Sequence, residues 1–193
     1  GEGHDLALTE LLDGTHRFLA RAGTERGGDL LAEIDGGEPR EEDVAAAAAV
    51  HDRARARMGR TLDVHALRDV LLANLDHPRW DDVASRCVAC ANCTLVCPTC
   101  FCTAVEDTAD LAGEEAERFR VWDSCFSTDY SYIHGGSIRS SGRSRYRQGL
   151  THKLGTWVDQ FGALGCVGCG RCITWCPVGI DLTEEIAAIR VPE

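Results

Sequence analysis

CVACANCTLVCP at residues 87–98 and CVGCGRCITWCP at residues 166–177 repeat one cysteine pattern within this chain. In each stretch three cysteines recur at every third position, and a fourth follows four residues later, directly before a proline. Three thiolates with this spacing allow one short loop to wrap three corners of an iron–sulfur cubane, and the run ending in Cys-Pro is typical of two-cluster ferredoxins. The repeat therefore predicts two 4Fe-4S clusters.

The fourth cysteine of each stretch is predicted to bind the cluster of the other stretch, as in two-cluster ferredoxins. The resulting ligand sets are Cys87, Cys90, Cys93 and Cys176 for cluster 1, and Cys97, Cys166, Cys169 and Cys172 for cluster 2. This crossed ligation joins segments that are separated by 68 residues, 98–165. Small residues within the loops, Ala89, Ala91, Gly168 and Gly170, allow backbone amides to approach the sulfides.

Two other uses of these cysteines fit the sequence less well. Structural zinc sites present two separated pairs of ligands, whereas each stretch here carries four cysteines in eleven residues. A disulfide framework requires an oxidising compartment and is typical of small secreted chains. The chain shows no hydrophobic leader, and its cysteine count of 11 is odd.

Composition narrows the functional classes further. The formal net charge of -11 argues against nonspecific binding of nucleic acid. No run reaches the ~18 to 20 apolar residues of a membrane span, so we expect a cytoplasmic protein. The chain begins at Gly1, and Met58 is its only methionine. We therefore expect a piece of a longer gene product or a processed form.

The predicted fold class is mainly α with small β content. Residues 1–84 are expected to form a helical N-terminal region, with helices over 5–22, 41–58 and 63–76 and one helical turn or strand over 30–34. Acidic residues at 41–43 and arginines at 53–57 match the two ends of a helix dipole. Residues 85–193 are expected to form a ferredoxin-like two-cluster domain, with a long insertion over 98–165 between the motifs.

Within that insertion we predict a short helix after Pro98 that carries Val105 and Leu111, and then an extended segment over 119–122. Residues 127–151 are expected to make a long surface excursion, with a helix over about 139–153. Asp181 and Glu184 are placed to cap a last helix that runs through Arg190.

Three cysteines lie outside the repeated pattern: Cys100, Cys102 and Cys125. They are either buried apolar thiols, a common fate of cysteine, or ligands of a third metal centre. In the second interpretation a noncysteine partner such as Asp123, His134 or His152 completes the site.

A basic strip interrupts the acidic chain between residues 136 and 153, where no acidic residue occurs. It is either a solvated helical face that compensates the negative clusters or a docking surface for an acidic partner subunit. Its members are Arg139, Arg143, Arg145, Arg147 and Lys153.

Several short segments, together with the two motifs, resemble one protein family. They are Cys97-Pro-Thr-Cys-Phe-Cys102, Trp122-Asp-Ser-Cys125, Arg145-Tyr-Arg147, His152-Lys153, Gly165 through Cys172 and, more loosely, Asp5 through Glu10. The chain resembles the iron–sulfur beta subunits of cytoplasmic NAD(P)-linked nickel–iron hydrogenases, also called sulfhydrogenases, and the related iron–sulfur subunit of anaerobic sulfite reductase. The resemblance is strongest over residues 85–182, and family members are longer at the N-terminus.

The resemblance implies that the eight motif cysteines are ligands and that the chain is a noncatalytic electron-transfer component of an oxidoreductase complex. It would pass electrons between a flavin- and NAD(P)-binding subunit on one side and the hydrogenase small subunit, or a sulfite-reducing subunit, on the other. The alternatives are a free soluble ferredoxin-like carrier and a redox-sensing iron–sulfur module. The large insertion between the motifs favours a subunit that stays docked to a partner.

Overall fold

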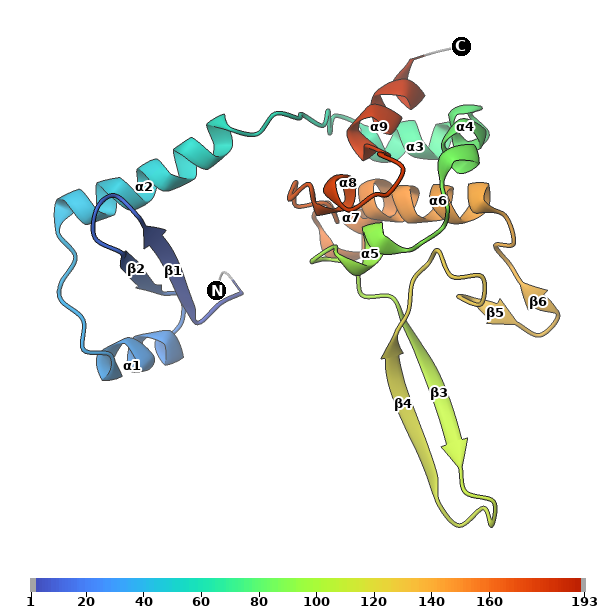
Figure 1. Ribbon diagram of the computed structural model, residues 1–193, viewed down its shortest axis with the longest axis horizontal. Coiled ribbons are helices and arrows are strands. Elements are labelled where there is room, and N and C mark those ends of the chain that lie inside the picture. The colour runs from blue at the N-terminus through green and yellow to red at the C-terminus, as the bar shows by residue number, and fades with distance from the viewer. Residues whose placement is uncertain (1–2, 192–193) are drawn as a thin grey trace. The chain divides into compact units, whose positions relative to one another are not determined.

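The computed structural model describes residues 3–191 and contains two compact units (Figure 1). The first unit ends at Thr61 and the second begins at Leu62. The sequence predicts a boundary near residue 84, whereas two helices of that N-terminal region lie in the second unit. No helix within residues 3–191 has the length and apolar character needed to span a membrane.

The first unit begins with an antiparallel hairpin of β1 (Leu6–Leu11) and β2 (Arg17–Ala22), in which Leu6 lies opposite Ala22. The predicted helix over residues 5–22 is therefore wrong. Its apolar positions also fit a strand alternation, and the Asp13-Gly14 pair between them is a strong hairpin signal. Gly14 has a φ of 126°, which a residue with a side chain rarely adopts.

Two helices complete the first unit. Thr24 caps α1 (Glu25–Glu33), so residues 30–33 are helical, and the helix ends before Ile34. The helix predicted over 41–58 is confirmed as α2 (Glu41–Ala56), with its acidic first turn and its arginines in the last turn. An ion pair between Arg17 and Asp43 joins β2 to α2.

The second unit is built around a helix that sequence analysis placed on the surface. α6 (Gly142–Thr151) continues through a π-helical turn (His152–Thr156) into α7 (Trp157–Phe161). It lies against α3 (Leu67–Ala73) and α4 (Arg79–Arg86), which in turn contact α9 (Leu182–Arg190). The helix itself was predicted, but the expectation of a surface excursion is wrong for this part of residues 127–151.

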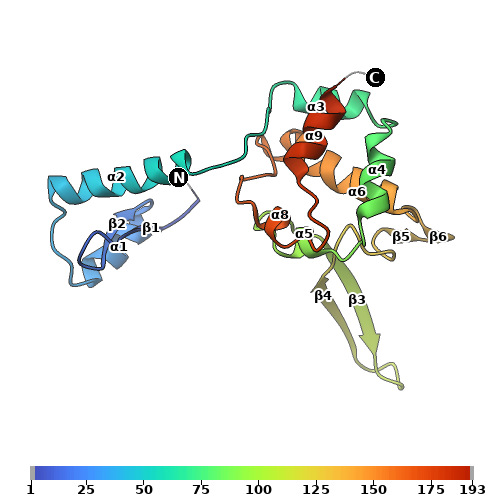
Figure 2. The same cartoon turned by 45° about the horizontal axis from the view of Figure 1, so that its top comes forward.

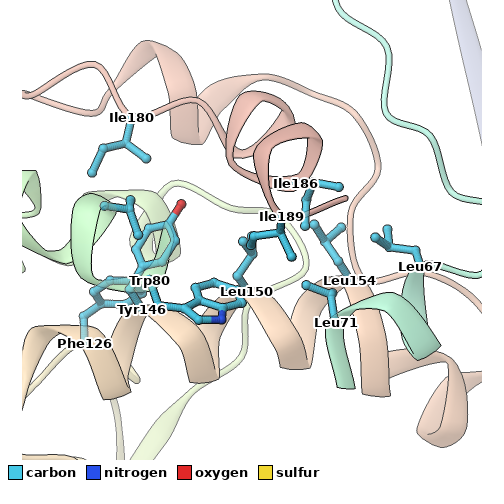
Figure 3. Close-up of a cluster of buried hydrophobic side chains, with 11 residues drawn as sticks. Leu67, Leu71, Trp80, Phe126, Tyr146, Leu150, Leu154, Ile180, Ile186 and Ile189 are labelled. Atoms are coloured by element: carbon cyan, nitrogen blue, oxygen red, sulfur yellow. The ribbon is translucent and has the colours of Figure 1, made fainter. Parts of the chain in front are cut away.

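This helix is buried because it carries an apolar stripe among polar residues. Tyr146, Leu150 and Leu154 recur at every fourth position and are all buried. Figure 3 shows this stripe facing side chains from α3, α4 and α9. The core comprises Leu67, Leu71, Trp80, Val83, Phe126, Tyr146, Leu150, Leu154, Ile180, Ile186 and Ile189.

The rest of the second unit consists of short elements. α5 (Asn92–Leu95) and α8 (Arg171–Thr174) belong to the two cysteine motifs. A small hairpin pairs β5 (Tyr132–Ile133) with β6 (Gly136–Ser137). Helix accounts for about 41% of the residues and strand for about 16%, so the prediction of a mainly α fold with small β content is confirmed.

The segment after the first motif forms a hairpin of β3 (Thr103–Ala109) and β4 (Ala116–Trp122), in which Thr103 lies opposite Trp122. The predicted helix after Pro98 is therefore wrong, whereas the extended segment over 119–122 is confirmed. Asp110 stabilises the turn, because its carboxylate accepts the backbone N–H groups of Glu114 and Glu115. Both views show the hairpin projecting from the helices of the second unit (Figures 1 and 2).

A buried carboxylate ties the C-terminal helix to the segment that precedes the first motif. Glu185 is 1% exposed and accepts hydrogen bonds from Arg79 at 2.6 Å and Arg86 at 2.8 Å. As predicted, Asp181 caps α9; its side chain accepts the N–H of Thr183. Because Arg86 directly precedes Cys87, this ion pair fixes the start of the first cysteine loop.

We expect Glu185→Gln to lower the free energy of unfolding by about 3 kcal/mol, because it leaves two arginines without their buried counter-charge. Chemical denaturation of the reconstituted protein, followed by circular dichroism, measures the change. Glu184→Gln is the matched control, since Glu184 is exposed on the same helix. Equal stability of the two variants would contradict a structural role for this ion pair.

Candidate metal centres

The two cysteine motifs adopt the same local backbone. Ala89 and Ala91 have φ values of 52° and 63°, and the corresponding glycines, Gly168 and Gly170, both have 70°. A short helix follows each loop, so that Cys93 lies in α5 and Cys172 lies in α8. Left-handed alanine costs about 1 to 3 kcal/mol and persists only where the surroundings enforce it. The surrounding structure thus holds each loop in this shape.

The two loops lie side by side although they are far apart in the sequence. α5 and α8 are in contact, and the side chain of Asn92 donates to the carbonyl of Trp175 at 3.3 Å. Cys176 lies close enough to Cys87 and Cys93 to affect their pKa values, and Cys97 affects that of Cys172 in the same way. The fold thus brings together the members of each predicted ligand set, with the fourth cysteines crossed between the motifs.

The donors fit a 4Fe-4S cluster in kind and number. Each set offers four thiols, and 4Fe-4S clusters are held by four cysteine thiolates. No three Cys, His, Asp or Glu side chains within residues 3–191 converge on a point that could hold one metal ion. A cubane instead spreads its thiolates over four irons. Ligation of the individual cysteines stays a prediction.

The first set lies against the core. Burial raises the pKa of Cys93 to about 12, and burial also raises the pKa of Cys87. The buried ring of Tyr146 is close by, and its pKa is raised by burial, by Glu185 and by Cys93. The backbone N–H of Ile180 donates to Cys176 Sγ at 3.3 Å. Because metal ligands must be deprotonated, a cluster bound by these cysteines would release the protons that burial otherwise retains.

The second set differs from the first at Cys97, whereas burial raises the pKa of its Cys172 to about 11. Lys153 Nζ lies 3.2 Å from Cys97 Sγ and also donates to the Thr99 hydroxyl at 2.8 Å. A hydrogen bond from the Cys100 thiol, together with Thr99 and Lys153, lowers the pKa of Cys97 to about 4. A thiolate at this position is therefore stable before any metal binds.

The predicted docking strip does not form one exposed surface. Arg143 pairs with Asp76 and Asp81, and Arg147 pairs with Asp76. The other three residues also have partners within the chain. Arg139 donates to the Ser131 hydroxyl, Arg145 donates to the carbonyls of Arg139 and Ser140, and Lys153 donates to Cys97 Sγ. Each of these cations has an intramolecular partner, and docking through them stays a prediction.

The three remaining cysteines lie near the second set. A cavity of about 440 Å³ is lined by residues that include Cys97, Cys100, Cys102 and Asp123. A hydrogen bond from the Cys125 thiol lowers the pKa of Cys102 to about 6.

The candidate noncysteine partners of this third site are placed differently. Asp123 lines the same cavity, and His152 is near enough to Cys102 to lower its pKa. His134 is exposed on the turn between β5 and β6. The structure thus favours Asp123 or His152 over His134 as the fourth ligand.

Three residues near the thiols were not singled out for these contacts by the sequence. Thr99 hydrogen bonds to Lys153 and to the carbonyl of Gly165. Tyr130 hydrogen bonds to Cys102, and burial raises the pKa of Tyr130 to about 12. Tyr146 lies between Arg145 and Arg147, so the sequence gives no sign that it is buried near the thiols. One signal was available for Lys153, because it is the only lysine among 20 basic residues.

Comparison with known proteins gives two matches. Residues 86–180 match the family model of the 4Fe-4S dicluster domain. The chain is 32% identical, over 192 residues, to sulfhydrogenase 2 subunit beta of Pyrococcus furiosus. The match covers 98% of this chain and 56% of that relative, so the chain spans about half the relative's length. No solved structure matches the chain.

We expect Cys97→Ser to change the same cluster as Cys166→Ser, and Cys176→Ser to change the same cluster as Cys87→Ser. Crossed ligation is the physical reason, because each fourth cysteine lies beside the other motif. Electron paramagnetic resonance of the reduced variants makes the comparison. A Cys97→Ser spectrum that matches Cys87→Ser instead would show that each motif binds its own cluster.

Proposed function

Since the chain carries a 4Fe-4S dicluster domain and is a relative of a hydrogenase beta subunit, we propose that it relays single electrons within an oxidoreductase complex. One partner would be a flavin- and NAD(P)-binding subunit. The other would be a nickel–iron hydrogenase subunit, or a sulfite-reducing one. Because the chain spans about half the length of this relative, both partners are proposed here and are not inferred from the relative alone.

The observation that carries the proposal is the pairing of the two cysteine loops. Contact between α5 and α8, and the proximity of Cys176 to Cys93 and of Cys97 to Cys172, support two four-thiol sets that lie beside each other. When bound, 4Fe-4S clusters supply one-electron redox chemistry. The core, against which Cys87, Cys93 and Cys176 pack, would exclude water from one side of the first cluster.

The exposed residues of the two loops support electron transfer to a docked partner. Cys90 and Cys169 are exposed, one in each motif, whereas the other motif cysteines are partly covered. Val88 and Val167 occupy equivalent positions beside them and are 61% and 62% exposed, and Trp175 is 61% exposed. Exposed apolar side chains around a redox site are suited to contact with another protein. We propose that the redox partner covers these residues.

A tagged copy of the chain, purified from its native cells at low salt, tests the proposed relay. We expect a stable complex that contains flavin and nickel, whose iron–sulfur signals appear on addition of NAD(P)H. A monomer that is reduced and reoxidised without partners would instead support a free ferredoxin-like carrier or a redox-sensing module.

Two variants then locate the docking surface. Trp175→Asp should weaken the complex, because it places a charge in an apolar contact. Reversal of the predicted basic strip, by Arg139→Glu and Arg143→Glu, is the comparison. Loss of the complex only in the second variant would assign docking to the strip.

A third metal centre at Cys100, Cys102 and Cys125 is also part of the proposal. The cavity beside Cys97 and the contact between Cys102 and Cys125 support it. We expect more iron per chain than the roughly eight atoms of two 4Fe-4S clusters, and a return to about that number in the Cys100→Ser/Cys102→Ser variant. Metal analysis of the reconstituted protein measures this, and an unchanged count of about eight would exclude the third centre.

A further inference from the structure

We propose that Lys153 is a positioning residue that raises the reduction potential of one cluster, through its contact with Cys97. The inference rests on the proposed function, because it requires a cluster on the set that contains Cys97. It adds that the two clusters differ in reduction potential and that Lys153 causes this difference.

The ammonium group of Lys153 is held at a fixed point. It has three N–H donors, and three acceptors lie at hydrogen-bond distance: Cys97 Sγ at 3.2 Å, Thr99 Oγ1 at 2.8 Å and the Gly165 carbonyl at 3.2 Å. Cys100 also interacts with this ammonium. The same nitrogen lies 5.0 Å from the centre of the Trp157 ring, within range of a cation–π contact. Such a group cannot swing freely between the thiolate and solvent.

Lys153 also connects the two chain segments that supply this ligand set. Gly165 directly precedes Cys166, and its N–H donates to the Lys153 carbonyl at 3.0 Å. A side chain at Gly165 would meet Trp157 at 2.5 Å, so only glycine permits this approach. Backbone and side chain of Lys153 therefore bind the start of the second motif while the ammonium reaches Cys97 of the first.

The local helix geometry places the lysine at this point. Lys153 lies in the π-helical turn His152–Thr156, between the buried stripe of α6 and the short helix α7. Such single π-helical turns occur frequently at functional sites. Leu154, the next residue, is fully buried in the core. The core thus anchors the turn from which the ammonium extends.

The choice of lysine is distinctive in this chain. Every other basic position, out of 20 Lys and Arg residues, is arginine. A lysine carries a compact charge with three rotatable donors, whereas arginine presents a planar fork suited to carboxylates. Three acceptors around one point match an ammonium and not a guanidinium.

The consequence for redox chemistry follows from charge. Hydrogen bonds to cluster sulfurs and nearby charge set the potential of an iron–sulfur cluster. Reduction adds one negative charge, which a cation at Cys97 Sγ stabilises. At the other set, Cys176 Sγ accepts a neutral backbone N–H from Ile180. Arg145 also acts on Cys87 through its charge, but its hydrogen bonds go to the carbonyls of Arg139 and Ser140. The cluster that includes Cys97 should therefore be reduced first and hold the electron longer.

Redox titration of the reconstituted protein, followed by electron paramagnetic resonance, tests the proposal with three variants. Lys153→Met should shift the reduction equilibrium of one cluster at least tenfold toward the oxidised form, about 59 mV for a one-electron couple. Lys153→Arg keeps the positive charge, so it should shift the potential of this cluster less than Lys153→Met. Arg171→Met removes the same charge at an exposed position one residue from Cys172, and should shift either cluster much less. Equal shifts for the methionine variants, or no shift in Lys153→Met, would overturn the proposal.

A measurement on the unaltered protein covers the case in which Lys153→Met fails to assemble. Because the chain has one lysine, growth on lysine labelled with ¹⁵N at Nζ marks this nitrogen alone. Pulsed electron paramagnetic resonance of the partly reduced protein should detect ¹⁵N coupling on the cluster that is reduced at the higher potential. Coupling to the other cluster, or to neither, overturns the inference.

The same experiments separate this inference from the proposed function. If the reconstituted chain binds no 4Fe-4S clusters, the proposed function fails and the inference fails with it. If both clusters form and only the predicted difference in potential is missing, the relay stands and the role of Lys153 is rejected.

Discussion

The apolar stripe of α6 is the interaction on which the second unit depends. Tyr146, Leu150 and Leu154 fill the space between α3, α4 and α9, so burial of one helix face stabilises four helices. Removal of such side chains from water contributes roughly 1.5 to 3 kcal/mol each. The position of α6 then determines where its π-helical extension lies, and thereby where Lys153 meets Cys97.

The two ligand sets share a backbone shape but differ in their surroundings. The first lies against Tyr146 and the core, where burial favours protonated thiols in the absence of metal. The second has a fixed ammonium at Cys97. Since the motifs have nearly the same spacing and local conformation, the difference comes from the segment between them. That segment, residues 98–165, is therefore part of the site as well as a connection.

Secondary structure was predictable where local signals agree with the tertiary environment. The dipole-matched charges of α2 and the Asp181 cap of α9 suffice because helix ends obey local rules. The hairpin of β1 and β2 is hard to predict because its leucines fit both a helix and a strand periodicity, and only the Asp13-Gly14 turn favours the hairpin. The β3–β4 hairpin was missed because a proline after a cluster loop permits a helix without requiring one. α6 was placed at the surface because three apolar residues were outnumbered by arginines and serines.

The chemistry of the site can be predicted without the fold: the eight motif cysteines, their spacing and the small residues in the loops indicate two iron–sulfur clusters. Thiolate spacing along a short loop is a local property, so it can be read without the fold. The folded structure was needed to show that the loops lie side by side, that Arg143 and Arg147 of the basic strip pair with Asp76, and that its lysine contacts a cysteine. Those features depend on contacts between residues more than 50 positions apart, such as Cys97 and Lys153, which no local pattern encodes.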